Sequence, residues 1–398
     1  MEDVLILTRH YAPEPTGSAP VMQQIAEWLA SQGFKVRLVT VRPNYPGNAV
    51  FEGYANGERD EAIENGVAVT RFDTRPMKGS GLLGRLVPET KFMIDLALAR
   101  LSGRVAPSRH VISLCPSILT TLAASLFVTR DGRHLGIVHD IQSGLGDALG
   151  SPVLRVIMPV LRLVERTALN RTDDVVVLSE EMREGLIRLG VRRAITIQPP
   201  SIDTRMIVPI DREAGAAPTL LYSGNLGRKQ GLEQLLDLAE VLLKRGSPAR
   251  IVIRGDGAMR ESLTSEAGRR GLNNVTFLPL APRNELAKAL SDADLHLVPQ
   301  IADGGGFAVP SKVFAIMAAG RTFVATAEPD SSLGRLAKDS GGFVCVPSQA
   351  PEAFADAVEE LLANATQRAQ LAARGRDYVL REVDTDVVMR RLLKVLAP

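Results

Sequence analysis

Strand-like apolar runs alternate with helix-like segments along the whole chain, and this alternation constrains the fold more than any other feature. A first series of strand-like runs occupies residues 4–8, 35–41, 67–72, 110–114, 135–139 and 174–178. A second series occupies residues 219–222, 250–253, 275–277, 295–298, 322–325 and 342–346. Alternation of this kind predicts a parallel sheet with helices on both faces. Two series predict an α/β protein of two doubly wound, Rossmann-like domains.

The length agrees with this division, because 398 residues are too many for one ordinary hydrophobic core. Residues 198–218 hold four prolines and an Ala/Gly patch, which is typical of an interdomain linker. We therefore expect one domain in residues 1–200 and a second in residues 201–380. The last helix, expected at 383–396, is amphipathic, and we expect residues 381–398 to pack back on the first domain. Parallel sheets of this type bind ligands beyond the carboxyl ends of their strands, so chemistry is sought there.

Composition excludes several classes of function. A net charge of +2 and an aromatic content of 4% argue against nucleic-acid binding and against a platform for stacking bases. Cys115 and Cys345 lie far apart in apolar runs, which favours buried small side chains and a reducing cytoplasm over a disulfide or a metal pair. The first residues read as neither a signal peptide nor a membrane span, so we expect any membrane role to be peripheral.

The segment 219–233, TLLYSGNLGRKQGLE, reads as a strand, a glycine-bearing loop and the start of a helix. Gly224 and Asn225 open the loop, and Arg228 and Lys229 add positive charge where we expect the helix to begin. Backbone N–H groups at a helix start, together with cations, suit a phosphate or diphosphate. The alternative is an ordinary turn with solvated basic side chains.

Further glycine and proline turns follow strands in the second half. Gly255 follows one strand, and the loop from Leu278 to Leu280 follows another and has backbone groups suited to a base edge. A third strand leads to a glycine-rich stretch and then to a helix start with a serine and a lysine. The candidate residues of that stretch are Asp303, Gly305, Gly306, Phe307, Ser311 and Lys312. Each turn alone is compatible with a structural role, but their succession at strand ends indicates a ligand-binding edge.

The first half offers candidates of a different kind. Gly17 and Ser18 precede a helix and present backbone N–H groups to a ligand. His139 and Asp140 end an apolar strand, where acid/base chemistry or substrate orientation is expected, although a structural histidine is the alternative. The match of residues 79–84 to G-x-G-x-x-G is rejected as a dinucleotide fingerprint, because it lies seven residues beyond its strand. No histidine, cysteine and carboxylate cluster with ligand spacing predicts a metal site.

Residues 75–109 carry seven cations against two acids, with apolar residues among them. A basic, apolar helical region suits the anionic surface of a membrane. The alternative is the solvated face of a helix that packs on the core.

Taken in order, these segments resemble the retaining glycosyltransferases of family four, which have the GT-B fold of two Rossmann-like domains facing across a cleft. The resemblance covers nearly the whole chain and is strongest through YSGNLGRKQGLE, RGDG, NNVTFLPL, LSDADLHLVPQ and PSKVFAIMAAGR. It is closest to exopolysaccharide and colanic-acid-type transferases. It implies transfer of a hexosyl group, with retention, from a nucleotide-diphosphate sugar, expected to be UDP-linked. It also implies a glycan or polyprenyl-diphosphate-linked acceptor at the inner face of the cytoplasmic membrane, and no metal or other cofactor.

Position by position, the resemblance implies that Lys229, with Arg228, holds the donor diphosphate. It places Gly17 and Ser18 near donor phosphate and acceptor, the 278–280 loop beside the nucleobase, and Asp140 on the acceptor side. The chain departs from the family at two glutamates, which fall at Phe307 and Ala315; Asp303 replaces the first only with a shifted loop. Ser311 and Lys312 are then expected to contact phosphate or sugar instead. Two alternatives remain open, a non-catalytic sugar-nucleotide-binding partner and a GT-B sugar-nucleotide epimerase.

Overall fold

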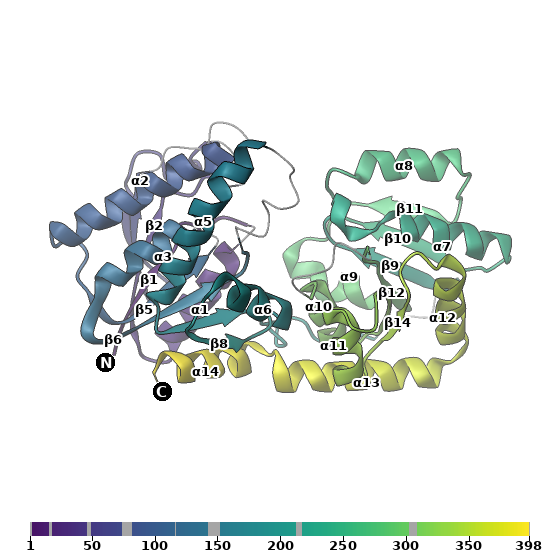
Figure 1. Ribbon diagram of the computed structural model, residues 1–398. Helices are drawn as coiled ribbons and strands as arrows, with labels where there is room; N and C mark the ends of the chain where they lie inside the picture. Colours follow the sequence, from purple (N-terminus) through teal and green to yellow (C-terminus); the bar gives the residue numbers. More distant parts are fainter. Residues whose placement is uncertain are drawn as a thin grey trace. The chain divides into compact units, whose positions relative to one another are not determined.

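The computed structural model describes residues 2–15, 18–45, 49–73, 82–115, 117–141, 152–211, 217–301 and 309–397, without the side chains of 82–86, 152–157, Lys229 and Arg283. The chain forms two compact units (Figure 1). Unit 1 is Met1–Gln198 together with Met389–Pro398, and unit 2 is Pro199–Val388.

Unit 1 is built on an eight-stranded sheet of order β3-β4-β2-β1-β5-β6-β7-β8. β3 pairs antiparallel with β4, and the other neighbours are parallel. β1 lies between β2 and β5, so the order of the strands reverses at β1. The strands are β1 Asp3–Leu7, β2 Lys35–Val41, β3 Glu61–Glu64, β4 Val67–Phe72, β5 Ser108–Cys115, β6 Val128–Val138, β7 Asp174–Val177 and β8 Ala194–Ile197.

Helices cover both faces of this sheet (Figure 1). Alternate residues of β1 point to opposite faces, so Val4 and Ile6 belong to one buried cluster and Leu5 and Leu7 to another. The helices with residues in unit 1 are α1 Ala19–Ser31, α2 Leu82–Leu101, α3 Ile118–Ala124, α5 Pro152–Asn170, α6 Glu180–Leu189 and the end of α14 Thr385–Leu396. Burial on both faces explains why the central strands read as continuous apolar runs.

Unit 2 contains a parallel six-stranded sheet of order β11-β10-β9-β12-β13-β14. Its strands are β9 Thr219–Ser223, β10 Arg250–Arg254, β11 Val275–Leu278, β12 Leu295–Val298, β13 Phe323–Thr326 and β14 Val344–Val346. Its helices are α7 Glu233–Lys244, α8 Arg260–Arg269, α9 Leu286–Ser291, α10 Lys312–Ala318, α11 Ser332–Ser340, α12 Pro351–Ala363 and α13 Ala365–Glu382. Two buried clusters fill this unit, and the strand order reverses between β9 and β12.

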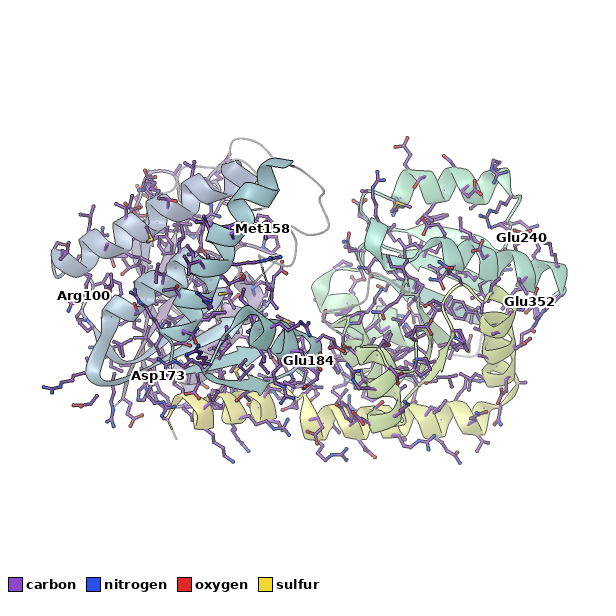
Figure 2. The ribbon with its side chains drawn as sticks, viewed as in Figure 1. Arg100, Met158, Asp173, Glu184, Glu240 and Glu352 are labelled. Atoms are coloured by element: carbon purple, nitrogen blue, oxygen red, sulfur yellow. The ribbon has the colours of Figure 1, made fainter. Side chains whose placement is uncertain are left out.

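Charged side chains fasten helices α7 and α12 at the surface of unit 2. Arg245, at the end of α7, donates to Asp356 and Glu359 at 2.8 Å each and also pairs with Glu352. Figure 2 labels Glu352 and, on α7, Glu240. Exposed ion pairs of this kind add little stability singly but fix the relative position of two helices.

The predicted α/β class with two parallel, helix-covered sheets is confirmed. Two details are corrected. The helix expected to begin at Arg228 and Lys229 begins at Glu233, and the two cations lie in a short 3-10 turn, Arg228–Gln230. The last helix begins at Thr385, after α13 has ended at Glu382. Among the described helices, none combines the length and the apolar character needed to cross a bilayer.

Candidate active site

The carboxyl edge of the unit 2 sheet brings together most of the described donor-side candidates. Gly224 directly follows β9, and Gln300 lies two residues after β12, at the point where the strand order reverses. Open parallel sheets bind ligands at this position because two neighbouring crossovers leave in opposite directions there. The residues around Gly224 therefore form the expected ligand-binding end of the unit 2 sheet.

A buried lysine amine lies at this edge. Lys312 Nζ is 3.9 Å from the centroid of the Tyr222 ring, and a Cβ added to Gly224 would lie 3.7 Å from the same nitrogen. The amine has no hydrogen-bond partner among the described residues. Burial lowers the pKa of Lys312 to about 7. A buried cation without a counter-ion is costly, and an anionic ligand would remove that cost, so this edge suits a phosphate.

Packing between neighbouring loops accounts for two of the glycines. A Cβ on Gly255 would lie 2.0 Å from the Gly224 carbonyl oxygen, so no other residue fits there. Leu226 N donates to the Asp256 carbonyl at 2.8 Å, which joins the loops after β9 and β10. Asn225 is exposed, and its carbonyl accepts a hydrogen bond of 2.8 Å from the Tyr222 hydroxyl. The structure thus brings Gly224, Asn225 and Gly255 together.

The turn that carries the two cations is anchored against the end of β12. Gln234 Nε2 donates to the Gln300 carbonyl at 2.8 Å, and a Cβ on Gly231 would lie 3.1 Å from the Gln300 carbonyl carbon. Arg228 is exposed and has no ion pair with a described residue. The side chain of Lys229 lies outside the described ones. The anchoring places the cationic turn beside the residues that lead into the 302–308 stretch.

The remaining candidates of unit 2 are less concentrated. Ser311 is exposed at the start of α10, while Asp303, Gly305, Gly306 and Phe307 lie outside the described residues. The Leu278 carbonyl accepts hydrogen bonds from Gly255 N at 3.0 Å and from Arg260 at 3.1 Å. Because these donors occupy it, that carbonyl is poorly suited to a nucleobase, whereas Leu280 exposes its side chain.

In unit 1, His139 and Asp140 follow β6 at the carboxyl edge of the sheet. His139 N donates to the Cys115 carbonyl at 3.3 Å, which holds the turn against the end of β5. Burial lowers the pKa of His139 to about 4, so its ring is neutral at pH 7. Asp140 is exposed. Ser18 precedes α1 and its carbonyl accepts Met22 N at 3.0 Å, while Gly17 lies outside the described residues.

Sequence reasoning missed a buried charged cluster after β1. Arg9 and Glu14, in the loop after β1, and Glu89, on α2, are all buried. Burial lowers the pKa of Arg9, and the carboxylates of Glu89 and Glu14 oppose that shift. The signal in the sequence was the density of charge in RHYAPEP, a short loop at a strand end. Within the described part of the chain, no group of three or more histidine, cysteine or acidic residues is arranged to hold a metal ion.

The two sheets and their helices form a fold of the GT-B type, which solved structures share. The structure is similar to sucrose-phosphate synthase from Thermosynechococcus elongatus, with a TM-score of 0.76 at 18% identity over 99% of this chain and 98% of the other. It is also similar to HepE of Anabaena, solved in complex with UDP-glucose, with a TM-score of 0.70 at 14% identity over the whole of both chains. The expectation of a GT-B fold is therefore confirmed.

The sequence comparisons then give the family. The sequence model described as glycosyl transferases group 1 matches residues 207–378, and that of the glycosyl transferase 4-like domain matches residues 16–200. The chain belongs to the group 1 glycosyltransferases. It is 29% identical to the putative colanic acid biosynthesis glycosyl transferase WcaI of Escherichia coli over 98% of each chain. It is 27% identical to the alpha-D-kanosaminyltransferase of Streptomyces kanamyceticus over 55% of this chain and 58% of that one.

Proposed function

We propose that this glycosyltransferase moves a hexosyl group, with retention, from a UDP-linked sugar to a glycan or polyprenyl-diphosphate-linked acceptor in cell-surface polysaccharide biosynthesis. The observation that carries the proposal is the Lys312 amine beside Gly224, which has no partner among the described residues and lies at the reversal point of the unit 2 sheet. The resemblance to WcaI supports the pathway, and the UDP-glucose complex of HepE supports the donor. Retention and the lipid-linked acceptor rest on the family resemblance.

The chemistry needs fixed positive charge more than it needs acid/base groups. The diphosphate gains negative charge as the bond to the sugar breaks, and an ammonium held in place stabilises that charge. Loss of one such contact typically costs roughly 2.7–4 kcal/mol in comparable sites. At the position of the family's second glutamate, which contacts the ribose, this chain has Ala315, and this residue follows Lys312 on α10. Lys312 then supplies a charge contact to the donor in place of that ribose contact. With Arg228 and Lys229 in the neighbouring turn, three cations serve the donor, and we propose that no metal is required.

A peripheral membrane contact belongs to the same proposal and uses residues of the 75–109 segment. Val87, Ile94, Leu98 and Leu101 are exposed, and their spacing places them along one face of α2. Arg100 lies near the end of the helix (Figure 2), Arg104 is exposed just beyond it, and the acid Glu89 is buried. Exposed apolar residues beside cations suit the anionic inner face of the cytoplasmic membrane, where the polyprenyl-linked acceptor would be found.

A screen of UDP-, GDP- and dTDP-sugars by thermal shift, followed by transfer assays with the donor that binds, tests the proposal. A donor at 100 times its dissociation constant adds about 2.7 kcal/mol of stability. Lys312→Met is expected to fold but to lose about 100- to 1,000-fold in turnover, by analogy with removal of one oxyanion donor. Lys229→Ala should behave in the same way. Lys338→Met, an exposed lysine on α11, is the matched control.

Three results would contradict the proposal. Binding of a nucleotide sugar with no turnover of any donor would favour a non-catalytic binding partner. Wild-type turnover in Lys312→Met, with the protein folded, would remove the amine from the donor site. Full activity after treatment with EDTA is expected, and its loss would contradict the metal-independent mechanism.

A further inference from the structure

The amide of Gln234 is buried at the carboxyl edge of the unit 2 sheet, and each of its polar atoms has a partner. Gln234 is the second residue of α7 and is 8% exposed. Its Nε2 donates to the carbonyls of Gly231 and Gln300, at 3.2 and 2.8 Å, and its Oε1 accepts Gln349 N at 3.1 Å. A flipped amide would place its oxygen against two carbonyl oxygens and its NH2 group against an N–H donor. The amide therefore has one orientation.

The Gln300 carbonyl connects the ends of three strands to the start of α7. Besides Gln234, the hydroxyls of Thr326 and Ser348 donate to it, each at 3.2 Å. Thr326 ends β13 and also accepts Gln300 N at 3.0 Å, whereas Ser348 and Gln349 follow β14. The ends of β12, β13 and β14 and the start of α7 thus share one hydrogen-bond network. All of these residues belong to unit 2.

The network fixes the end of the turn that carries Arg228 and Lys229. Gly231 ends this turn in the left-handed region, at φ +64°. A Cβ on Gly231 would lie 2.6 Å from Gln234 Nε2 and 3.1 Å from the Gln300 carbonyl carbon, so the turn packs as closely as a glycine allows. An apolar side chain of the same length would fill the space of Gln234 without needing hydrogen-bond partners. The amide therefore supplies position in addition to packing.

We propose that Gln234 is a positioning residue for the donor diphosphate, which holds the turn of Arg228 and Lys229 at a fixed place on the unit 2 edge. The inference rests on the proposed function, because it names the group that keeps the cations of that site in place. Cations on a fixed turn bind a phosphate without the loss of conformational entropy that a loose turn would suffer on binding. Gln234 itself touches no ligand and acts only through the turn.

Gln234→Met removes the three hydrogen bonds of the amide and keeps a side chain of similar length. We expect the affinity for UDP to fall at least about tenfold, since loss of a partner that orients a binding group typically costs about 10- to 100-fold in the comparable case of metal ligands. The affinity for uridine should be nearly unchanged, because uridine carries no phosphate. The ratio of the two affinities reports the phosphate contacts alone, whereas a general loss of structure would weaken both ligands.

The decisive measurement repeats the change without the cations. In the background Arg228→Ala/Lys229→Ala, Gln234→Met should leave the already lowered affinity for UDP unchanged, because the residue has no cation left to position. Such non-additivity is typical of residues that act as one unit. Calorimetry with UDP and ligand-observed NMR with uridine measure the affinities of the full chain, and urea unfolding shows that each variant is folded. Gln370→Met, the same change at an exposed site on α13, is the matched control.

Gly231→Ala provides a second test that does not depend on the folding of Gln234→Met. Its Cβ would push the turn away from Gln234 and Gln300, so the same selective loss of UDP affinity is expected.

The outcomes separate this inference from the function on which it rests. Wild-type protein that binds UDP no better than uridine, or that keeps its UDP affinity after Arg228→Ala/Lys229→Ala, contradicts the proposed function. A wild-type ratio of UDP to uridine affinity in folded Gln234→Met or Gly231→Ala overturns the inference and leaves the function standing. A further loss of UDP affinity caused by Gln234→Met in the background without the cations also overturns it. A selective loss of UDP affinity that disappears in that background supports it.

Discussion

At the scale of single residues, Lys312 has an unfavourable environment for a charged side chain. Its amine is buried against the Tyr222 ring and has no hydrogen-bond partner among the described residues. A cation over an aromatic face gains about 2 kcal/mol when it is desolvated, but that gain does not replace hydration, and the pKa of Lys312 is accordingly lowered to about 7. The charged form of Lys312 therefore weakens the free protein, and no described residue supplies its counter-ion.

The pH dependence of the protein's stability should reflect the lowered pKa of Lys312. The pKa of Lys312 falls from its ordinary value of 10.5 to about 7 on folding, because the amine is buried. Between these values the unfolded chain binds more protons than the folded one, so this residue makes the free energy of unfolding rise with pH. We expect Lys312→Met to be more stable than the wild type at pH 6 and this advantage to shrink toward pH 10. Urea unfolding at each pH measures the difference.

The control for this prediction is Lys338→Met, which should change stability little at every pH. A constant difference between Lys312→Met and the wild type across the range would mean that the amine does not titrate near neutrality. Binding gives the opposite dependence, because a diphosphate needs the charged amine. The affinity for UDP is therefore expected to fall as the pH rises above 7.

The roles of such residues were only partly accessible from sequence. The family segment YSGNLGRKQGLE and the PSK segment were recognisable from the sequence. The contact of Lys312 with Tyr222 joins residues 90 positions apart, and no local sequence pattern predicts it. The same holds for Glu14, whose partners Asn44 and Tyr45 lie some 30 residues downstream. The burial of Glu14 was not predicted, because buried residues in a loop leave no periodic pattern in the sequence.

At the scale of elements, buried strands and long helices were predictable and partly exposed elements were not. Strands β2 and β4 lie where the apolar runs placed them. Strand β3 was missed because its one large apolar residue, Ile63, is exposed, and β8 was missed because none of its residues is fully buried. The start of α7 was misplaced because Gly231, in the left-handed region at φ +64°, ends the 3-10 turn before the helix begins. Backbone turns of this kind depend on packing with Gln300, which the local sequence does not contain.

The exposed apolar face of helix α2 allows a test of the proposed membrane contact. Leu98 and Leu101 are exposed on the face proposed to contact the membrane, and Leu101 is 83% exposed. Replacing both with glutamate removes apolar contact and adds negative charge, and a loss of about 1.4 kcal/mol already means a tenfold weaker association. We expect the double variant to bind vesicles with anionic lipids at least about tenfold more weakly than the wild type in a sedimentation assay.

The matched control uses an exposed leucine of unit 2. Leu380→Glu, on α13, introduces the same change outside the proposed face and should leave vesicle binding unaltered. Equal binding by the wild type and the double variant would assign the exposed face of α2 to solvent, which is the alternative that the sequence left open. Binding of the wild type to neutral vesicles as strongly as to anionic ones would contradict the electrostatic part of the proposal.

At the scale of the whole molecule, the two units have separate cores, yet the chain returns to the first after building the second. Met389, Leu392 and Leu396 belong to the buried cluster that contains Val4 and Ile6. Unit 1 is therefore completed by the last residues of α14. The clusters of unit 2 contain only residues between Pro199 and Val388, so the unit carrying Lys312 buries its own apolar residues.

Separate cores predict that a donor nucleotide stabilises the two units unequally. UDP at 100 times its dissociation constant lowers the population of the unfolded form of the unit that binds it by about 100-fold, which corresponds to about 2.7 kcal/mol. Amides of β9 and β12 that exchange through unfolding of unit 2 should then exchange about 100-fold more slowly. Amides of β1 and β5 should be unaffected, because the three cations proposed to hold the diphosphate lie in unit 2. Hydrogen exchange followed by mass spectrometry of the full chain, with and without UDP, measures both sets in one sample.

The variant Lys312→Met serves as the internal test of this prediction, since it should lose most of the UDP-dependent protection of β9 and β12 while its exchange without UDP stays cooperative. Equal slowing of exchange in both units would show that they unfold together, so that separate cores do not mean separate stability. Slowing confined to β1 and β5 would place the nucleotide in unit 1 and reverse the assignment of donor and acceptor sides. The pattern of protection thus decides which sheet edge holds the diphosphate without any knowledge of the sugar or the acceptor.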